Sequence, residues 1–132
     1  MQWNGTKNAG FSDGQPWLAV NSNYAKINVE EALANPESIF YTYQKLVEIR
    51  KENSWLIRAD FELLDTAEKV FAYIRKDGDR RFLVVANLSN QKQEFAVEES
   101  VKSNLIENTS VEKVLATQTL APWDAFCVEL AD

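Results

Sequence analysis

Apolar side chains recur at helical spacing between residues 36 and 53. Ile39 and Tyr43 lie on one side of a 3.6-residue period, and neighbouring apolar residues widen the stripe. Asn35 is a suitable N-cap, and Pro36 suits the first helical position, where its missing N–H is not needed. The pattern predicts a helix over residues 36–53, and its broad apolar face requires a large surface to pack against.

The hydrophobic period changes to two after residue 54. "VFAYIR" alternates between two faces, and "RFLVVANL" is a nearly continuous apolar run, typical of a strand buried on both faces. The five residues "KDGDR" between them contain Asp-Gly, which is a strong hairpin signal. Four more candidate strands cover residues 60–65, 93–97, 103–107 and 125–130. Six short strands with turn signals between them predict an antiparallel β-sandwich.

Residues 1–35 follow neither period. Glycines and a proline punctuate an aromatic-rich loop, which is followed by the short helical segment "NVEEALAN". Asn28 and Glu31 have the spacing of a capping box at its start. The order of loop, helix and strands indicates a junction between two domains. We therefore predict one part at 1–53 and an antiparallel β domain at 54–132.

Composition excludes several classes of partner and site. The net charge of −6 offers no basic run for nucleic acid, and no apolar stretch is long enough to cross a membrane. The chain has no histidine and a single cysteine, Cys127, which removes His-based nucleophile pairs and the usual zinc sites. Phosphate-binding glycine motifs are also absent, so we expect neither a metal nor a cofactor. The densest basic group predicts a solvated hairpin tip; it consists of Arg75, Lys76, Arg80 and Arg81.

Carboxylates are the main catalytic groups left. Retaining glycosidases need two carboxyl groups roughly 5–5.5 Å apart across the sugar. The neighbours Glu98 and Glu99 would point to opposite faces of a strand, and the other close pairs lie at a helix cap or a turn. We expect no catalytic pair within this chain.

Four short motifs resemble, in order and spacing, one stretch of the α-amylase clan of glycoside hydrolases. They are "MQW", "NAGF", "PWLAVNSNY" and "INVEEAL". The branch is that of oligo-1,6-glucosidase, dextran glucosidase and trehalose-6-phosphate hydrolase. The resemblance continues through "ESIFYTYQKLVEIRKEN", "VVANLSN" and "LAPWDAFCVEL", and so covers nearly the whole chain. Ser22 departs from the proline usual in the branch.

The resemblance implies an α+β fragment, in which the last loop and eighth helix of a (β/α)8 barrel precede a C-terminal antiparallel β domain. The family's catalytic carboxylates lie on earlier barrel strands, so none maps onto this chain, and we expect the chain alone to be inactive. The missing barrel would be its partner, and an oligosaccharide would bind only in the intact cytoplasmic enzyme. The parent reaction implied is retaining hydrolysis of α-glucosidic, chiefly α-1,6, bonds.

The resemblance also implies that the opening loop lines the parent's active site, because barrel active sites are built from such loops. Gln2, Trp3, Phe11 and Asn21 are the candidate substrate-binding residues. The alternative is that the aromatic rings pack the loop and the amides satisfy its backbone. Both readings stay open at the level of sequence.

A different class of function is a free-standing carbohydrate-binding or structural β module. Trp55 and Trp123 would then offer a sugar-binding surface, although packing is the expected role of both. The broad apolar face of the helix at 36–53 argues against this rival, and the same face is a surface for self-association. The substrate remains open among isomaltooligosaccharides, dextran ends, trehalose 6-phosphate and sucrose-like sugars, as does the origin of the chain as a truncated gene product.

Overall fold

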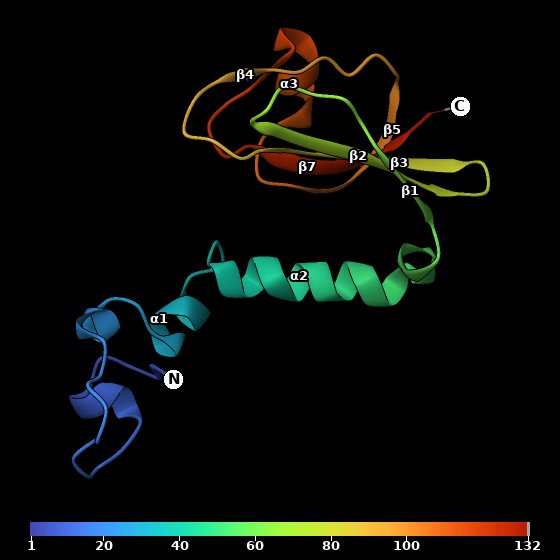
Figure 1. The fold of residues 1–132 in the computed structure, drawn as a ribbon. Helices are drawn as coiled ribbons and strands as arrows, with labels where there is room; N and C mark the ends of the chain where they lie inside the picture. The colour runs from blue at the N-terminus through green and yellow to red at the C-terminus, as the bar shows by residue number, and fades with distance from the viewer. Residues whose placement is uncertain (132) are drawn as a thin grey trace. The chain divides into compact units, whose positions relative to one another are not determined.

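The structure is a computed structural model that describes residues 1–131 (Figure 1). The chain divides into two compact units, Met1–Glu52 and Asn53–Asp132. The first unit holds two short 3-10 helices and two α-helices, whereas the second holds all of the strands. The predicted order of loop, helix and antiparallel sheet is therefore confirmed.

Helix α1, Val29–Ala34, begins where the sequence predicts. The side chain of Asn28 caps it, because its Oδ1 accepts the N–H of Glu31 at 2.9 Å. The amide nitrogen of Asn28 also donates to the carbonyl of Tyr24 at 2.8 Å. This second bond ties the preceding loop to the start of the helix.

Helix α2 runs over Ile39–Glu52, so its predicted start at residue 36 is wrong. Asn35 caps a turn instead of the helix, since its Oδ1 accepts the N–H of Glu37 at 3.0 Å. The helical hydrogen bonds begin after this turn, where the carbonyl of Ser38 accepts the N–H of Thr42 at 3.2 Å. None of the residues of α2 is buried, and the predicted apolar stripe is exposed.

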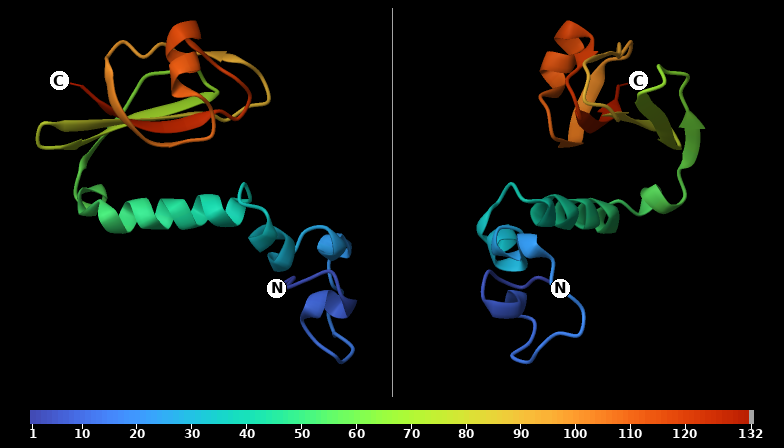
Figure 2. Two further views of the ribbon diagram at one scale, coloured as in Figure 1. Left: turned by 180° about the vertical axis from the view of Figure 1, so that it is seen from behind. Right: turned by 60° about the vertical axis from the view of Figure 1, so that its left-hand side comes forward.

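The second unit begins with the 3-10 helix η3, Ser54–Ile57, and contains a five-stranded antiparallel sheet (Figure 2). Its order is β1-β2-β3-β7-β5. The bounds are Asp60–Leu63 (β1), Val70–Asp77 (β2), Arg80–Asn87 (β3), Val101–Glu107 (β5) and Ala125–Leu130 (β7). The hairpin of β2 and β3 closes over two residues, with Gly78 at φ 60°.

A thinner layer covers one face of this sheet. Helix α3 (Val111–Thr117) and a two-stranded sheet of β4 (Gln93–Glu94) and β6 (Thr119–Leu120) form it, and Figures 1 and 2 show α3 and β4 on the same side. The core between the layers contains Val70, Ala72, Ile74, Leu83, Val85, Val111, Val114, Leu120, Phe126, Val128 and Leu130. The inward residues of β2 and β7 are those that the alternating pattern predicts.

Candidate functional site

The opening loop folds back on the start of α1. The N–H of Trp3 donates to the carbonyl of Ala9 at 2.8 Å, and the carbonyls of Gln2 and Trp3 accept the N–H groups of Val29 and Glu30, each at 2.9 Å. These bonds bring the first residues of the chain beside a helix that starts 26 positions after Trp3. The segment predicted as an irregular loop therefore has a defined backbone.

A run of left-handed backbone shapes this loop. Asn8, Ala9 and Gly10 have φ of 56°, 57° and 65°. A Cβ on Gly10 would lie 2.6 Å from Oδ1 of Asn4, so a larger residue there would need the Asn4 side chain to move as well as a positive φ. The amide nitrogen of Asn8 donates to the carbonyls of Ser12 and Gly14 at 2.8 Å each, which closes the turn.

A cavity of about 310 Å³ lies within this loop. It brings together three of the four predicted site residues, Gln2, Phe11 and Asn21, but Trp3 does not line it. Trp17 lines the cavity instead of Trp3. Its side chain is 92% exposed, compared with 62% for Phe11. The cavity thus combines two exposed aromatic rings with three amides, of which that of Asn8 closes the turn and those of Gln2 and Asn21 remain.

The two amides already make bonds within the loop. The amide nitrogen of Gln2 donates to Oδ1 of Asn23 at 3.0 Å and to the carbonyl of Ile27, so its oxygen is the group left for a ligand. Oδ1 of Asn21 accepts the N–H of Asn23 at 3.2 Å, which leaves its amide nitrogen. Two residues that line the cavity thus keep one acceptor and one donor, which together with the rings suits a hydroxylated, partly apolar ligand.

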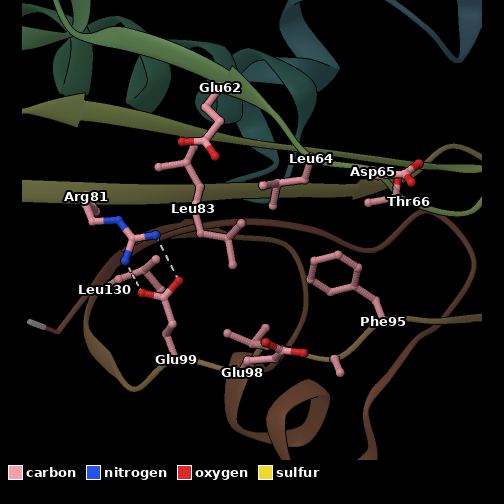
Figure 3. A pocket seen from close by; sticks show the side chains of 13 residues that line it. Glu62, Leu64, Asp65, Thr66, Arg81, Leu83, Phe95, Glu98, Glu99 and Leu130 are labelled. Atoms are coloured by element: carbon pink, nitrogen blue, oxygen red, sulfur yellow. Dashed lines mark hydrogen bonds and ion pairs between the residues drawn. The ribbon is translucent and has the colours of Figure 1, made fainter.

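A second cavity, of about 380 Å³, lies at the open edge of the β unit beside β1. Figure 3 shows Glu62 on one side of it, Phe95 and Glu98 on the other, and the side chain of Leu83 between them. The cavity is an incompletely filled part of the core, because Ile74, Leu83 and Leu130 belong to the core cluster.

Two of the four carboxylates around this second cavity are held by cations. Both oxygens of Glu99 are bound by the guanidinium of Arg81 (Figure 3), and Glu62 is paired with Lys76. The hydrogen bond from Lys76 lowers the pKa of Glu62, the opposite direction to that needed in a general acid. Among residues 1–131 no group of three acidic or cysteine side chains is placed to hold a metal ion.

The basic group does lie at a hairpin tip, where the side chains of Lys76, Arg80 and Arg81 are 35–46% exposed, and its arginines also have specific partners. Arg75 donates to the carbonyls of Leu56 and Ala59 at 3.0 and 2.7 Å. Arg80 binds both oxygens of Glu129 at 3.1 and 3.3 Å. The sequence pattern could not predict these bonds, because the partners are distant in sequence. Glu129 lies on β7, the neighbour of β3, and Leu56 and Ala59 lie before β1.

Glu129 is buried and is held by two cations. Arg80 chiefly, and then Lys102 at 3.1 Å, lower its pKa to about 2 from an ordinary value of 4.5. A carboxyl whose pKa is lower in the folded state stabilises that state above pH 4.5, and the contribution is lost as pH falls toward 2. Because both cations are about half exposed, we expect about 2 kcal/mol over this window.

Urea unfolding between pH 5 and pH 2 measures this contribution. The Glu129→Gln variant should lose part of the acid dependence, whereas Glu68→Gln, at a site 87% exposed, should keep it all. Equal slopes for the parent and Glu129→Gln would contradict the assignment.

The two tryptophans of the β unit have different roles. Trp55 is 7% exposed and stacks on Phe82 with ring centroids 3.8 Å apart, so its predicted packing is confirmed. Trp123 is 60% exposed, so it is not packed within the β unit, and its packing against another domain stays a prediction. Burial raises the pKa of the Cys127 thiol to about 11, as expected of an inert, largely apolar cysteine.

Comparison with known proteins assigns both parts of the chain. Residues 1–59 match the family model of the α-amylase catalytic domain, and residues 61–127 match that of the maltogenic amylase C-terminal domain. The chain belongs to the α-amylase family. The resemblance found in its short motifs is therefore confirmed, and so is the predicted fold class of barrel end followed by β domain.

Relatives within the α-amylase family match almost the full chain. A glucan 1,6-alpha-glucosidase of Streptococcus pneumoniae serotype 4 is 79% identical over 98% of the chain, and one of Streptococcus dysgalactiae subsp. equisimilis is 53% identical over 99%. The crystal structure of Bacillus licheniformis trehalose-6-phosphate hydrolase matches with a TM-score of 0.86 and 36% identity, over 99% of the chain and 25% of that structure. The chain spans about a quarter of the length of these relatives, 24% and 25% for the two glucosidases.

No helix in residues 1–131 has the length and apolar character needed to span a membrane.

Proposed function

We propose that this chain is the C-terminal part of an α-glucosidase that hydrolyses α-1,6 bonds of short glucose oligosaccharides with retention. The observation that carries the proposal is the 79% identity to a glucan 1,6-alpha-glucosidase over 130 residues. Residues 1–53 are the last loop and the eighth helix of the catalytic barrel, and residues 54–132 are the C-terminal β domain. The matches of residues 1–59 to the catalytic-domain model and of residues 61–127 to the C-terminal-domain model support two parts with a junction between residues 53 and 61.

The two carboxyl groups of a retaining glycosidase come from the rest of the enzyme in this proposal. The chain supplies one wall of the substrate site instead. Phe11 and Trp17 offer exposed ring faces, while Gln2 and Asn21 keep one oxygen and one nitrogen for sugar hydroxyls. Trp3 is a further candidate for this wall, since it is 48% exposed, although it does not line the cavity.

The apolar stripe of α2 is the surface that the rest of the barrel covers in this proposal. Ile39 and Tyr43 are 86% and 69% exposed, and exposed apolar patches of this kind mark interaction surfaces. In the isolated chain the same stripe is a site for self-association. The inert cysteine Cys127 fits the reducing conditions of the cytoplasm, which is the location we propose.

The experiment is a chimera in which this chain replaces the matching quarter of the Streptococcus pneumoniae relative. We expect the chimera to hydrolyse isomaltose. Phe11→Ala in the chimera should lower kcat/KM about tenfold, because it removes a stacking contact worth about 1.4 kcal/mol. Lys7→Ala, on the same loop but outside the cavity lining, is the matched control and should leave kcat/KM unchanged.

An unchanged kcat/KM in Phe11→Ala, Trp17→Ala and Gln2→Ala would show that this loop does not touch the substrate. Such a result would remove the substrate-binding role and leave the loop a packing role only.

A further inference from the structure

Trp123 occupies a turn position that disfavours its side chain. Residues 121–124 form a tight turn in which the N–H of Asp124 donates to the carbonyl of Ala121 at 3.2 Å. Pro122 takes the second position, and Trp123 the third, with φ 65°. Glycine or asparagine is preferred at a third position with positive φ, because a larger L-residue is strained there.

The surrounding residues hold Trp123 in this conformation. Its N–H donates to the carbonyl of Ser89 at 3.2 Å, and its carbonyl accepts from the amide of Asn108 at 2.9 Å. The amide of Asn87, a residue 1% exposed, donates to the carbonyl of Ala121 at 2.8 Å. A strained residue that its neighbours fix so fully is a candidate for function rather than for stability.

The indole of Trp123 is displayed and not packed. It is 60% exposed, and no aromatic or cation–π contact within residues 1–131 involves it. Trp55 shows the contrasting case, since it is buried against Phe82. The two tryptophans lie near opposite ends of β3. Trp55 stacks on Phe82, whereas Trp123 comes two residues before Ala125, which pairs with Ala86. Phe82 and Ala86 are four residues, or about 13 Å, apart along the strand.

We propose that Trp123 is a stacking platform for one glucose unit of an α-glucan. The indole face is flat, apolar and about the size of a sugar ring. Asn90, which is exposed, follows Ser89, whose carbonyl accepts the N–H of Trp123. The amide of Asn108 is used by the backbone of Trp123 and Ala125. A protein partner would need about 800 Å² of surface, but Leu88 is the other exposed large hydrophobic residue next to this turn. The choice of α-glucan rests on the proposed function.

The test follows the indole N–H signals of the ¹⁵N-labelled chain during titration with isomaltotriose. The chain has four tryptophans, so each signal can be assigned by replacing one at a time with phenylalanine. We expect the Trp123 signal to shift and saturate, and the signal of buried Trp55 to stay in place. In Trp123→Gly the saturable shift of this site should be lost.

Thermal unfolding separates a binding role from a packing role. Glycine adopts φ 65° without strain, so Trp123→Gly should keep its Tm within about 3 °C of the parent and above that of Trp123→Ala. A Tm lower by more than about 10 °C in Trp123→Gly would make the indole a packing anchor and overturn the proposal.

A Trp123 signal that does not move at saturating isomaltotriose would also overturn it. If the Trp17 signal alone moves, the cavity of the proposed function binds glucan and this second site does not exist. If Trp123 moves and the chimera described above is inactive, the second site stands while the proposed function fails.

Discussion

Trp55→Ala is expected to destabilise the β unit by about 4 kcal/mol, a large part of the stability of a small domain. Trp55 is 7% exposed, and its ring lies 3.8 Å from that of Phe82 at an interplanar angle of 12°. The guanidinium of Arg80 lies 4.7 Å from the Phe82 ring and also binds buried Glu129. Removing the indole opens a cavity over Phe82 and exposes this ion pair to water.

Differential scanning calorimetry and near-ultraviolet circular dichroism would measure the loss. A change of this size lowers Tm by roughly 15–30 °C in a unit of this length. Trp17→Ala is the matched control, because the same side chain is removed at a site that is 92% exposed. Equal Tm values for the two variants would show that the segment before β1 contributes no stability to the sheet.

The β unit is predictable from the sequence where one face of a strand is buried. The alternation of Val70, Ala72 and Ile74 gives the core face of β2 directly, and the Asp-Gly turn gives the hairpin. Helix α3 was missed although Ser110 caps it, accepting the Lys113 N–H at 3.3 Å. A seven-residue helix has too few turns for its period to be distinguished from a loop.

The hydrophobic pattern of the sequence does not predict which polar side chains pair over long distances along the chain. Arg80 and Glu129 are 49 residues apart, and only the pairing of β3 with β7 brings them together. The prediction of where α2 begins was wrong for a local reason, since an asparagine before a proline can cap either a helix or a turn. The pairing of strands thus decided the first case and local turn geometry the second.

The candidate site was predictable by region but not by residue. The motifs placed it in the opening loop, and the cavity does contain Gln2, Phe11 and Asn21. Its second ring is Trp17 and not Trp3, which does not line the cavity. Left-handed backbone at Asn8 and Ala9, where glycine is not present, cannot be foreseen from composition.

The largest functional effect is expected when the chain is combined with the rest of an enzyme. The isolated chain should release no nitrophenol from p-nitrophenyl α-glucoside, because its shifted carboxyls, Glu62, Glu112 and Glu129, all have lowered pKa values and none is poised as a general acid. Turnover that disappears when an acidic residue of this chain is replaced would contradict this expectation.

The most direct test of the account is reconstitution from two separately produced pieces. The first is the part of the Streptococcus pneumoniae glucan 1,6-alpha-glucosidase that precedes the segment matched here, and the second is this chain. Glucose release from isomaltose is measured for each piece and for the mixture. The account predicts no activity from either piece and activity from the mixture, reduced by Phe11→Ala but not by Lys7→Ala. A mixture that forms a stable complex and yet releases no glucose would contradict the claim that this chain completes the catalytic barrel.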